Sequence, residues 1–449
     1  MISFMQKIIV SGTLVLGFLA LNSCQPKDRT AYKLKAADTD LLHRSVRQVT
    51  DNIVYDIFSP PVASRIYAYS CVAGYEVLRN DFADYQSLGG QLNGLGEIPK
   101  PEAGKDYCFP LASVRAITTV GRKLIFSEDK MDEFRAKIEA DFAALDVPKD
   151  VYQRSIIYGD SVAKVILAWA DKDNYKQLRT ATKYTVSNDP AKWRPTPPMY
   201  MDAVEPHWNQ IRPFTLDSAA QFAPVAPALF DKNPKSAFYK LADEVYKTGN
   251  NLTAEQREIA KFWDCNPFVA NVEGHVMFAS KKISPGGHWI NIFRQVADVK
   301  KLTPIQVMET YALLSLGLAD GFISCWDEKY RRNVIRPESY INQYIDPKWV
   351  PLLQTPPFPE YTSGHSVVSG ASSVILTQLL GDGVAFRDTT ELEFGMTARS
   401  FASFNEAAAQ ASASRLYGGI HYRPALDNGL VQGENIGKWV LRKVQMHAK

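Results

Sequence analysis

Apolar residues recur with the 3.6-residue period of an α-helix along most of this 449-residue chain. One stripe, in which each residue lies three or four positions after the last, illustrates the period: Leu42, Val46, Val49, Ile53 and Ile57. A second stripe repeats it: Met131, Phe134, Ile138, Phe142 and Leu145. Alternating strand patterns are scarce. The sequence therefore predicts an all-α fold, and 46% hydrophobic residues supply enough apolar material for a large core.

Two capping boxes predict where helices begin. Thr253 is followed three residues later by Gln256, and Thr303 by Gln306. The second box places Pro304 at the first helical position, where a missing N–H costs nothing. The helix that opens there is apolar on most faces, which indicates a central, buried helix.

Proline distribution divides the chain. Nine of the 26 prolines lie between Pro190 and Pro234, where they block helices, and tryptophan and tyrosine residues are interleaved with them. We expect an N-terminal helical half (24–185), an extended connecting segment packed on the bundle (186–235), and a C-terminal helical half (236–449) that carries the functional site.

The first residues predict export. Lys7 precedes an apolar run over 8–20 that is too short to span a bilayer, and the run ends in a Leu-Asn-Ser-Cys sequence like a bacterial lipobox. We expect residues 1–23 to be a lipoprotein signal peptide and Cys24 to carry the lipid. The protein would then be anchored to a bacterial cell membrane, on its periplasmic or outer-membrane face, through that lipid alone. The alternative is a plain secretory signal with an incidental cysteine.

Charge and cysteine content narrow the possible partners. Lys plus Arg total 51 against 48 Asp plus Glu, which excludes a nucleic-acid binder that relies on bulk positive charge. The remaining cysteines have no spacing typical of a disulfide framework, so we expect four buried thiols: Cys71, Cys108, Cys265 and Cys325. The sequence leaves the oligomeric state open.

Three short segments combine into one candidate site. Lys329 and Arg336 are seven residues apart, so both cations can project from one helical face. Ser363 is well placed as a helix N-cap, and free backbone amides at such a position attract an anion. Arg415 and His421 lie on either side of a glycine pair. Cations, a hydroxyl, helix amides and histidines together suit a tetrahedral oxyanion with two or three negative charges.

This arrangement resembles the superfamily that joins vanadium-dependent haloperoxidases with type 2 phosphatidic acid phosphatases and bacterial acid phosphatases. The family pattern is Lys-x6-Arg-Pro, then Pro-Ser-Gly-His, then Ser-Arg-x5-His. In this chain the matching residues are Lys329, Arg336 and Pro337, then Thr362, Ser363, Gly364 and His365, then Ser414, Arg415 and His421. The long helical chain with its Pro-rich middle looks like a soluble haloperoxidase rather than a multi-span lipid phosphatase.

The resemblance implies a role for each residue. His421 would bond to the central atom, vanadium in a peroxidase or phosphorus in a phosphatase. His365 would be the acid or base, taking a proton from peroxide or giving one to a leaving group. The oxygens would be bound by Lys329, Arg336, Ser363, the Gly364 amide and Arg415. The cofactor would be vanadate in a peroxidase, and a phosphatase would need none.

Two positions depart from the family pattern. Thr362 replaces a proline that shapes the turn without touching the ion. Phosphatases place an aspartate four residues after the nucleophilic histidine, where this chain has Ala425. Asp427 is the nearest candidate to orient the ring of His421, and a backbone carbonyl is the alternative.

Two aromatic residues favour the peroxidase branch. Trp326 and Phe358 lie three and five residues before Lys329 and Ser363, spacings at which chloroperoxidase aromatics line the halide side of the pocket. We therefore expect a vanadate-dependent enzyme that uses small-molecule substrates, peroxide and halide. The first alternative is an acid phosphatase that acts through a phosphohistidine on soluble or lipid phosphate monoesters. The second is a non-catalytic oxyanion-binding lipoprotein.

A zinc enzyme is not favoured. Cys265, His275 and His288 are separated by ten and thirteen residues, which is not a metal-ligand spacing, and the chain has no His-Glu-x-x-His motif. We expect both histidines to be structural or to lie at the rim of the pocket.

Overall fold

The computed structural model describes residues 30–267, 269–273, 276–279 and 281–448. The chain is mainly helical, which confirms the predicted all-α class. The first helices are α1 (Tyr32–Ala36), α2 (Thr39–Tyr55), α3 (Pro60–Leu78), α4 (Phe109–Leu124), α5 (Glu128–Ala143), α6 (Lys149–Ala170) and α7 (Tyr175–Leu178). After a long segment follow α8 (Ala237–Asn250), α9 (Ala254–Phe262), α10 (Pro285–Lys300), α11 (Pro304–Arg332), α12 (Pro337–Tyr344), α13 (Gly364–Leu380), α14 (Phe404–Tyr417) and α15 (Arg423–Lys443).

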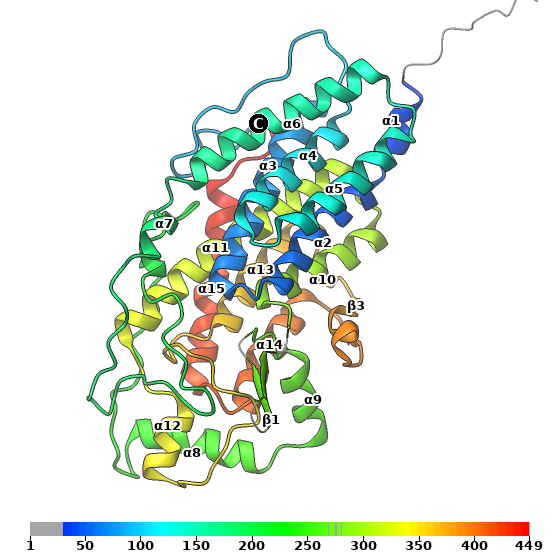
Figure 1. Ribbon diagram of the computed structural model, residues 1–449. Coiled ribbons are helices and arrows are strands. Elements are labelled where there is room, and N and C mark those ends of the chain that lie inside the picture. The colour runs from blue at the N-terminus through cyan, green and yellow to red at the C-terminus, as the bar shows by residue number, and fades with distance from the viewer. Residues whose placement is uncertain (1–29, 268, 274–275, 280, 449) are drawn as a thin grey trace, which may run out of the picture.

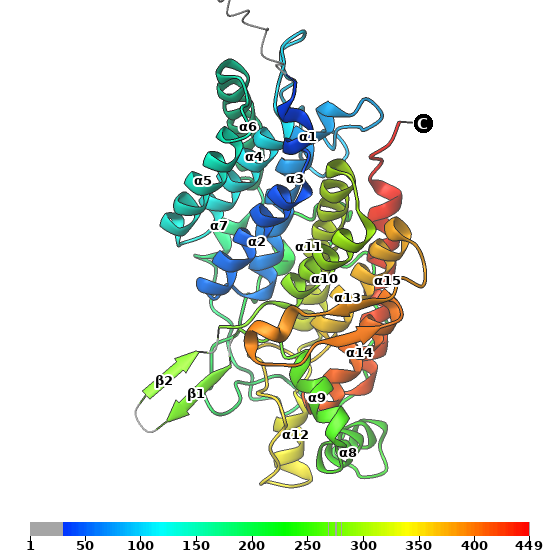
Figure 2. The ribbon, with the colours of Figure 1, turned by 90° about the vertical axis from the view of Figure 1, so that its right-hand side faces the viewer.

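Strands and 3₁₀ turns are few among the described residues. The strands form two antiparallel ribbons: β1 (Ala270–Glu273) with β2 (Val276–Ala279), and β3 (Phe386–Asp388) with β4 (Arg399–Phe401). The 3₁₀ turns are η1 (Arg79–Asp81), η2 (Trp208–Gln210) and η3 (Thr390–Phe394). The β1–β2 ribbon stands apart from the helices in Figure 2.

The helix α11 is the centre of the molecule. It begins at Pro304, as predicted, and every residue from Val307 to Lys329 is buried. It packs against α3 of the N-terminal helices and against α13 of the C-terminal ones, and it runs through the middle of the ribbon in Figure 1. The helix ends where Asn333 adopts a left-handed backbone with φ 54°. The last turns of this buried helix therefore lie at the candidate site.

The stripe on α2 is shorter than predicted. Leu42, Val46, Val49 and Ile53 are buried on one face. The helix ends at Tyr55, and Ile57 is not part of it because its backbone is left-handed, with φ 56°.

A buried carboxylate is one of the groups that bind the chain between α7 and α8. Its described residues contain the turn η2 and otherwise extended or irregular backbone. The carboxylate of Asp320, buried on α11, accepts hydrogen bonds from the backbone N–H of Phe214 (2.7 Å) and of Thr215 (2.8 Å). These bonds pair backbone N–H groups that have no helix or strand partner in this proline-rich segment.

The cysteine prediction is confirmed for the four thiols that the structure describes, because all four are buried and unbridged. Cys24 lies outside the described residues. Within the described part of the chain, no helix has both the length and the apolar composition needed to cross a membrane.

Candidate active site

Six of the predicted residues line one pocket: Trp326, Phe358, Gly364, His365, Arg415 and His421. They arrive from separate elements. Trp326 lies near the end of α11, and Gly364 and His365 form the first turn of α13. Arg415 lies in the last turn of α14, and His421 follows in the loop before α15. Residues scattered over a hundred positions therefore meet where four helices begin or end.

The ring of His421 is held by a residue that the sequence did not single out. Its Nδ1 lies 2.9 Å from Oε1 of Glu360, and the backbone N–H of Tyr422 donates to the same oxygen at 3.0 Å. A carboxylate at Nδ1 keeps the proton there and leaves Nε2 as an acceptor. Burial, followed by the nearby charges of Arg336 and Lys329, holds the pKa of His421 well below its ordinary value. The imidazole is thus neutral, the form that binds a metal.

The expectation that Asp427 or a backbone carbonyl orients His421 is wrong, because Glu360 occupies that position. Asp427 lies on the exposed side of α15, one turn after Arg423, and its charge acts on that arginine. One feature of the sequence could have indicated Glu360, because it stands only three residues before Ser363.

The two predicted arginines are buried, and one nitrogen of Arg336 is unpaired among the described residues. Arg336 donates from Nε to the Phe358 carbonyl at 2.9 Å, and its Nη1 lies 3.2 Å from Nε2 of His421. Its Nη2 is buried and has no hydrogen-bond partner among the described residues. Arg415 donates from Nη2 to the Trp263 carbonyl at 2.8 Å. Burial lowers the pKa of Arg336 to about 10, so it remains charged at neutral pH.

Lys329 contacts the loop before Ser363 rather than the pocket, whose lining residues in the described structure do not include it. Its Nζ lies near three carbonyl oxygens: Pro359 (3.0 Å), Glu360 (3.2 Å) and Thr362 (2.5 Å). An ammonium has three donors, so this set uses all of them. Burial lowers the pKa of Lys329 to about 7. In this arrangement the lysine fixes the loop and adds positive charge nearby.

His365 has a free acceptor position. Its Nε2 is buried and without a hydrogen-bond partner among the described residues, while the ring bonds to the backbone of Trp263. Burial, followed by the charge of Arg415, holds the pKa of His365 well below its ordinary value. A neutral imidazole that lines the pocket can accept a proton.

The first turn of α13 has the predicted cap. Ser363 is the N-cap, and its Oγ accepts a hydrogen bond from the backbone N–H of Ser366 at 3.3 Å. Thr362 stands at the place of the family proline. Its carbonyl accepts a hydrogen bond from Lys329, and its hydroxyl donates to Oε1 of Gln432 at 2.7 Å. The cap therefore fixes the position of the first turn of α13, whose residues Gly364 and His365 line the pocket.

Trp326 and Phe358 form an aromatic wall, with ring centroids 4.9 Å apart. The Nζ of Lys329 lies 5.0 Å from the Phe358 centroid, and the guanidinium carbon of Arg336 lies 5.1 Å from it. These cations approach the ring faces, where cation–π attraction is favourable. The pocket therefore has an aromatic side, and the Phe358 ring on that side contacts two buried cations.

Comparisons with known proteins give one consistent result. Residues 309–449 match the family model described as the VCPO second helical-bundle domain. A bacterial vanadium-dependent iodoperoxidase of known structure is 48% identical, with a TM-score of 0.86 over 92% of this chain and 98% of that one. No curated protein matches the sequence.

Two more distant structures share the fold. The apo form of a bacterial vanadium-dependent chloroperoxidase is 16% identical, with a TM-score of 0.64 over 86% of this chain and 95% of that one. A holo form is also 16% identical, with a TM-score of 0.66 over 94% and 97%. At this identity the similarity concerns the fold alone.

Proposed function

Because this chain belongs to the vanadium-dependent haloperoxidase family, we propose that its pocket binds vanadate and oxidises halide with hydrogen peroxide to hypohalous acid. The balanced reaction consumes one proton and releases one water: H₂O₂ + X⁻ + H⁺ → HOX + H₂O. The observation that carries the proposal is a buried excess of positive charge beside two unpaired polar atoms.

The charges around the pocket fit a dianion. Lys329, Arg336 and Arg415 are buried cations, and Glu360 is the carboxylate that hydrogen-bonds within this group among the described residues. Asp264 acts on Arg415, but its carboxylate is paired with a lysine at 2.6 Å. Burial lowers the pKa of Lys329 and raises the pKa of Glu360, both to about 7, so the charges of these two groups largely offset each other at neutral pH. The two arginines then leave about two positive charges, which is costly in a buried place without an anion. Hydrogen vanadate carries two negative charges and several oxygen acceptors for the unpaired Nη2 of Arg336.

Each side chain has a distinct task in this proposal. When bound, vanadate would supply Lewis-acid chemistry toward peroxide. Nε2 of His421 would bind the vanadium, and Glu360, at Nδ1, would keep Nε2 unprotonated. Nε2 of His365 takes the proton of the incoming peroxide. Arg336, Arg415 and the amide of Gly364 bind the oxygens, whereas Lys329 acts through its charge and by fixing the loop.

We propose iodide as the preferred halide. The relative at 48% identity is an iodoperoxidase, and Trp326 and Phe358 give the pocket an apolar side. Iodide is the most weakly hydrated of the common halides and the easiest to oxidise. It therefore loses the least hydration free energy when it enters such a pocket.

Orthovanadate should convert the purified apoprotein into an enzyme that oxidises iodide with hydrogen peroxide. We expect kcat/KM for iodide to exceed that for bromide by at least about tenfold, a difference of about 1.4 kcal/mol in barrier height. Triiodide absorbance and a bromination reporter measure the two rates. Hydrolysis of an aryl phosphate that vanadate inhibits would instead establish the acid phosphatase. Vanadate binding without either activity would establish a non-catalytic binder.

We also propose that the protein is exported and anchored through a lipid on Cys24. The support is the charged start, the short apolar run and the Leu-Asn-Ser-Cys sequence. Expressed in a bacterial host, the wild-type chain should incorporate labelled palmitate and partition with membranes. The Cys24→Ala variant should lose the label. Equal labelling of both chains, or a mature N-terminus other than residue 24, would contradict the anchor.

A further inference from the structure

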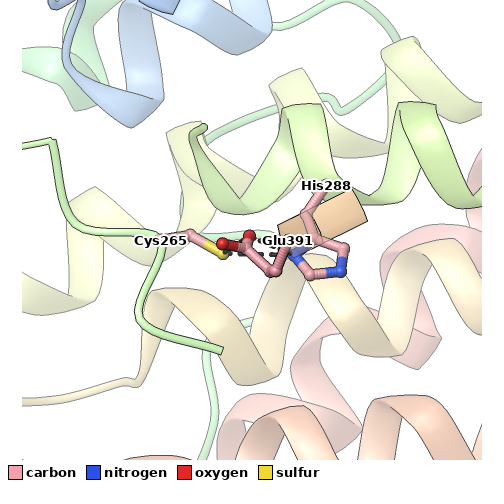
Figure 3. Close-up of side chains that lie close together, drawn as sticks. All are labelled: Cys265, His288 and Glu391. Carbon is pink, nitrogen blue, oxygen red and sulfur yellow. Dashed lines mark hydrogen bonds and ion pairs between the residues drawn. The ribbon is translucent and has the colours of Figure 1, made fainter. Parts of the chain in front are cut away.

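Three buried side chains with metal-binding atoms meet beside the pocket (Figure 3). Cys265 follows α9, His288 lies on α10, and Glu391 lies in η3. Sγ of Cys265 is 3.3 Å from Nδ1 of His288 and 3.8 Å from Oε1 of Glu391, and that oxygen is 3.2 Å from the same nitrogen. All three side chains are less than 5% exposed.

The sequence did not reveal this group, because its members are far apart along the chain. Cys265 and His288 do come together, although their spacing is not that of a zinc motif. Their third neighbour is Glu391, and His275 lies outside the described residues. Of the two alternatives expected for His288, a structural residue or a rim residue, the structure agrees with the first, because His288 is fully buried and is not among the residues that line the pocket.

The distances match the edges of a tetrahedral zinc site. Zinc lies about 2.3 Å from sulfur and about 2.0–2.2 Å from nitrogen or oxygen, so tetrahedral angles place the ligand atoms about 3.3–3.6 Å apart. The observed separations of 3.2, 3.3 and 3.8 Å differ from these values by only a few tenths of an ångström. A cation could therefore enter with small side-chain shifts.

The surroundings of His288 are also those of a metal ligand. Its other nitrogen, Nε2, lies 2.7 Å from Oδ2 of Asp388. Oδ1 of Asp388 accepts from the backbone N–H of Thr390 at 2.9 Å, and Trp263 stacks on the ring with centroids 4.5 Å apart. A carboxylate on the far nitrogen fixes the orientation and tautomer of a metal-bound imidazole.

We propose that Cys265, His288 and Glu391 bind a zinc ion next to the vanadate site, since Cys265 also lines that pocket. Binding would displace the thiol proton of Cys265, and Nδ1 of His288 would bind in its unprotonated form, because both ligand atoms must be deprotonated to bind the metal. Three protein ligands leave a fourth position for water. The ion would link α10, η3 and the segment that holds Trp263, whose carbonyl accepts from Arg415. Its role would be to stiffen this wall of the pocket.

Metal analysis of the full chain tests the proposal, with zinc and vanadium measured in the same sample. After equilibration with Zn²⁺ and removal of excess, the wild type should hold about one zinc per chain. Co²⁺ in its place should give a thiolate charge-transfer band in the near ultraviolet. Cys265→Ala should lose this band and bind zinc at least about tenfold more weakly. Cys108→Ala, which removes a buried thiol elsewhere, should match the wild type.

A second variant covers the case in which Cys265→Ala does not fold. Glu391→Gln keeps the size of the side chain and should also weaken zinc binding at least about tenfold. A wild type that binds no zinc would overturn the proposal, as would variants that keep the zinc and the cobalt band. The vanadium content and the iodide activity are read separately, so a protein active with vanadate but free of zinc refutes only the zinc site.

Discussion

His421→Ala is expected to abolish iodide oxidation, with a loss of at least about a thousandfold. The variant removes Nε2, the nitrogen that would bind vanadium. The other histidine that lines the described pocket, His365, bonds through its ring to the backbone of Trp263 rather than to a carboxylate. Glu360 would then be left facing an empty space. The measurement is steady-state iodide oxidation together with the vanadium content after gel filtration, and both should fall.

Two further variants determine what orients His421. Asp427→Ala should change activity by about twofold or less, because an exposed side chain on α15 contributes little. Glu360→Gln should weaken vanadate affinity by about 10–100-fold, since it replaces the charged acceptor at Nδ1 of His421 with a neutral amide. An equal loss in Asp427→Ala and His421→Ala would contradict the assignment of Glu360.

The contrast between Glu360 and Asp427 marks a limit of sequence reasoning. A motif reports residues whose spacing is set by one helix or turn, so the residues around Ser363 were enough to identify it as an N-cap. Glu360 acts on a histidine from a different loop, and only the packing of α13 against α15 brings them together. Lys329 shows the same limit. Its presence was predictable, but its use of three loop carbonyls was not.

The fold class was predictable for a physical reason. A helix must bury one stripe of side chains, and that stripe has a period visible in the sequence. The end of α2 was not predictable, because apolar spacing continues to Ile57 while the backbone turns left-handed there. The contacts of the proline-rich chain were equally hidden. One of them involves the carboxylate of Asp320, whose partners lie about a hundred residues away.

His365→Ala is expected to lower kcat for iodide oxidation by about 10²–10⁴-fold, the usual contribution of a general base. Vanadium content should be unchanged, because Nε2 of His365 would accept the proton of peroxide without bonding to vanadium. The buried environment of His365 supports its role as a proton acceptor. It holds the pKa of His365 well below its ordinary value, so the wild-type ring is neutral and ready to accept a proton at neutral pH.

Imidazole offers a direct test of that assignment. Added to the His365→Ala variant, it should restore part of the activity by entering the space left by the ring, whereas it should not help His421→Ala to the same degree. His207→Ala is the matched control, since this ring bonds to the Thr182 carbonyl outside the pocket, and it should behave as the wild type. If vanadium content and kcat fell in proportion in His365→Ala, the residue would be part of the anion-binding set and peroxide would need another base.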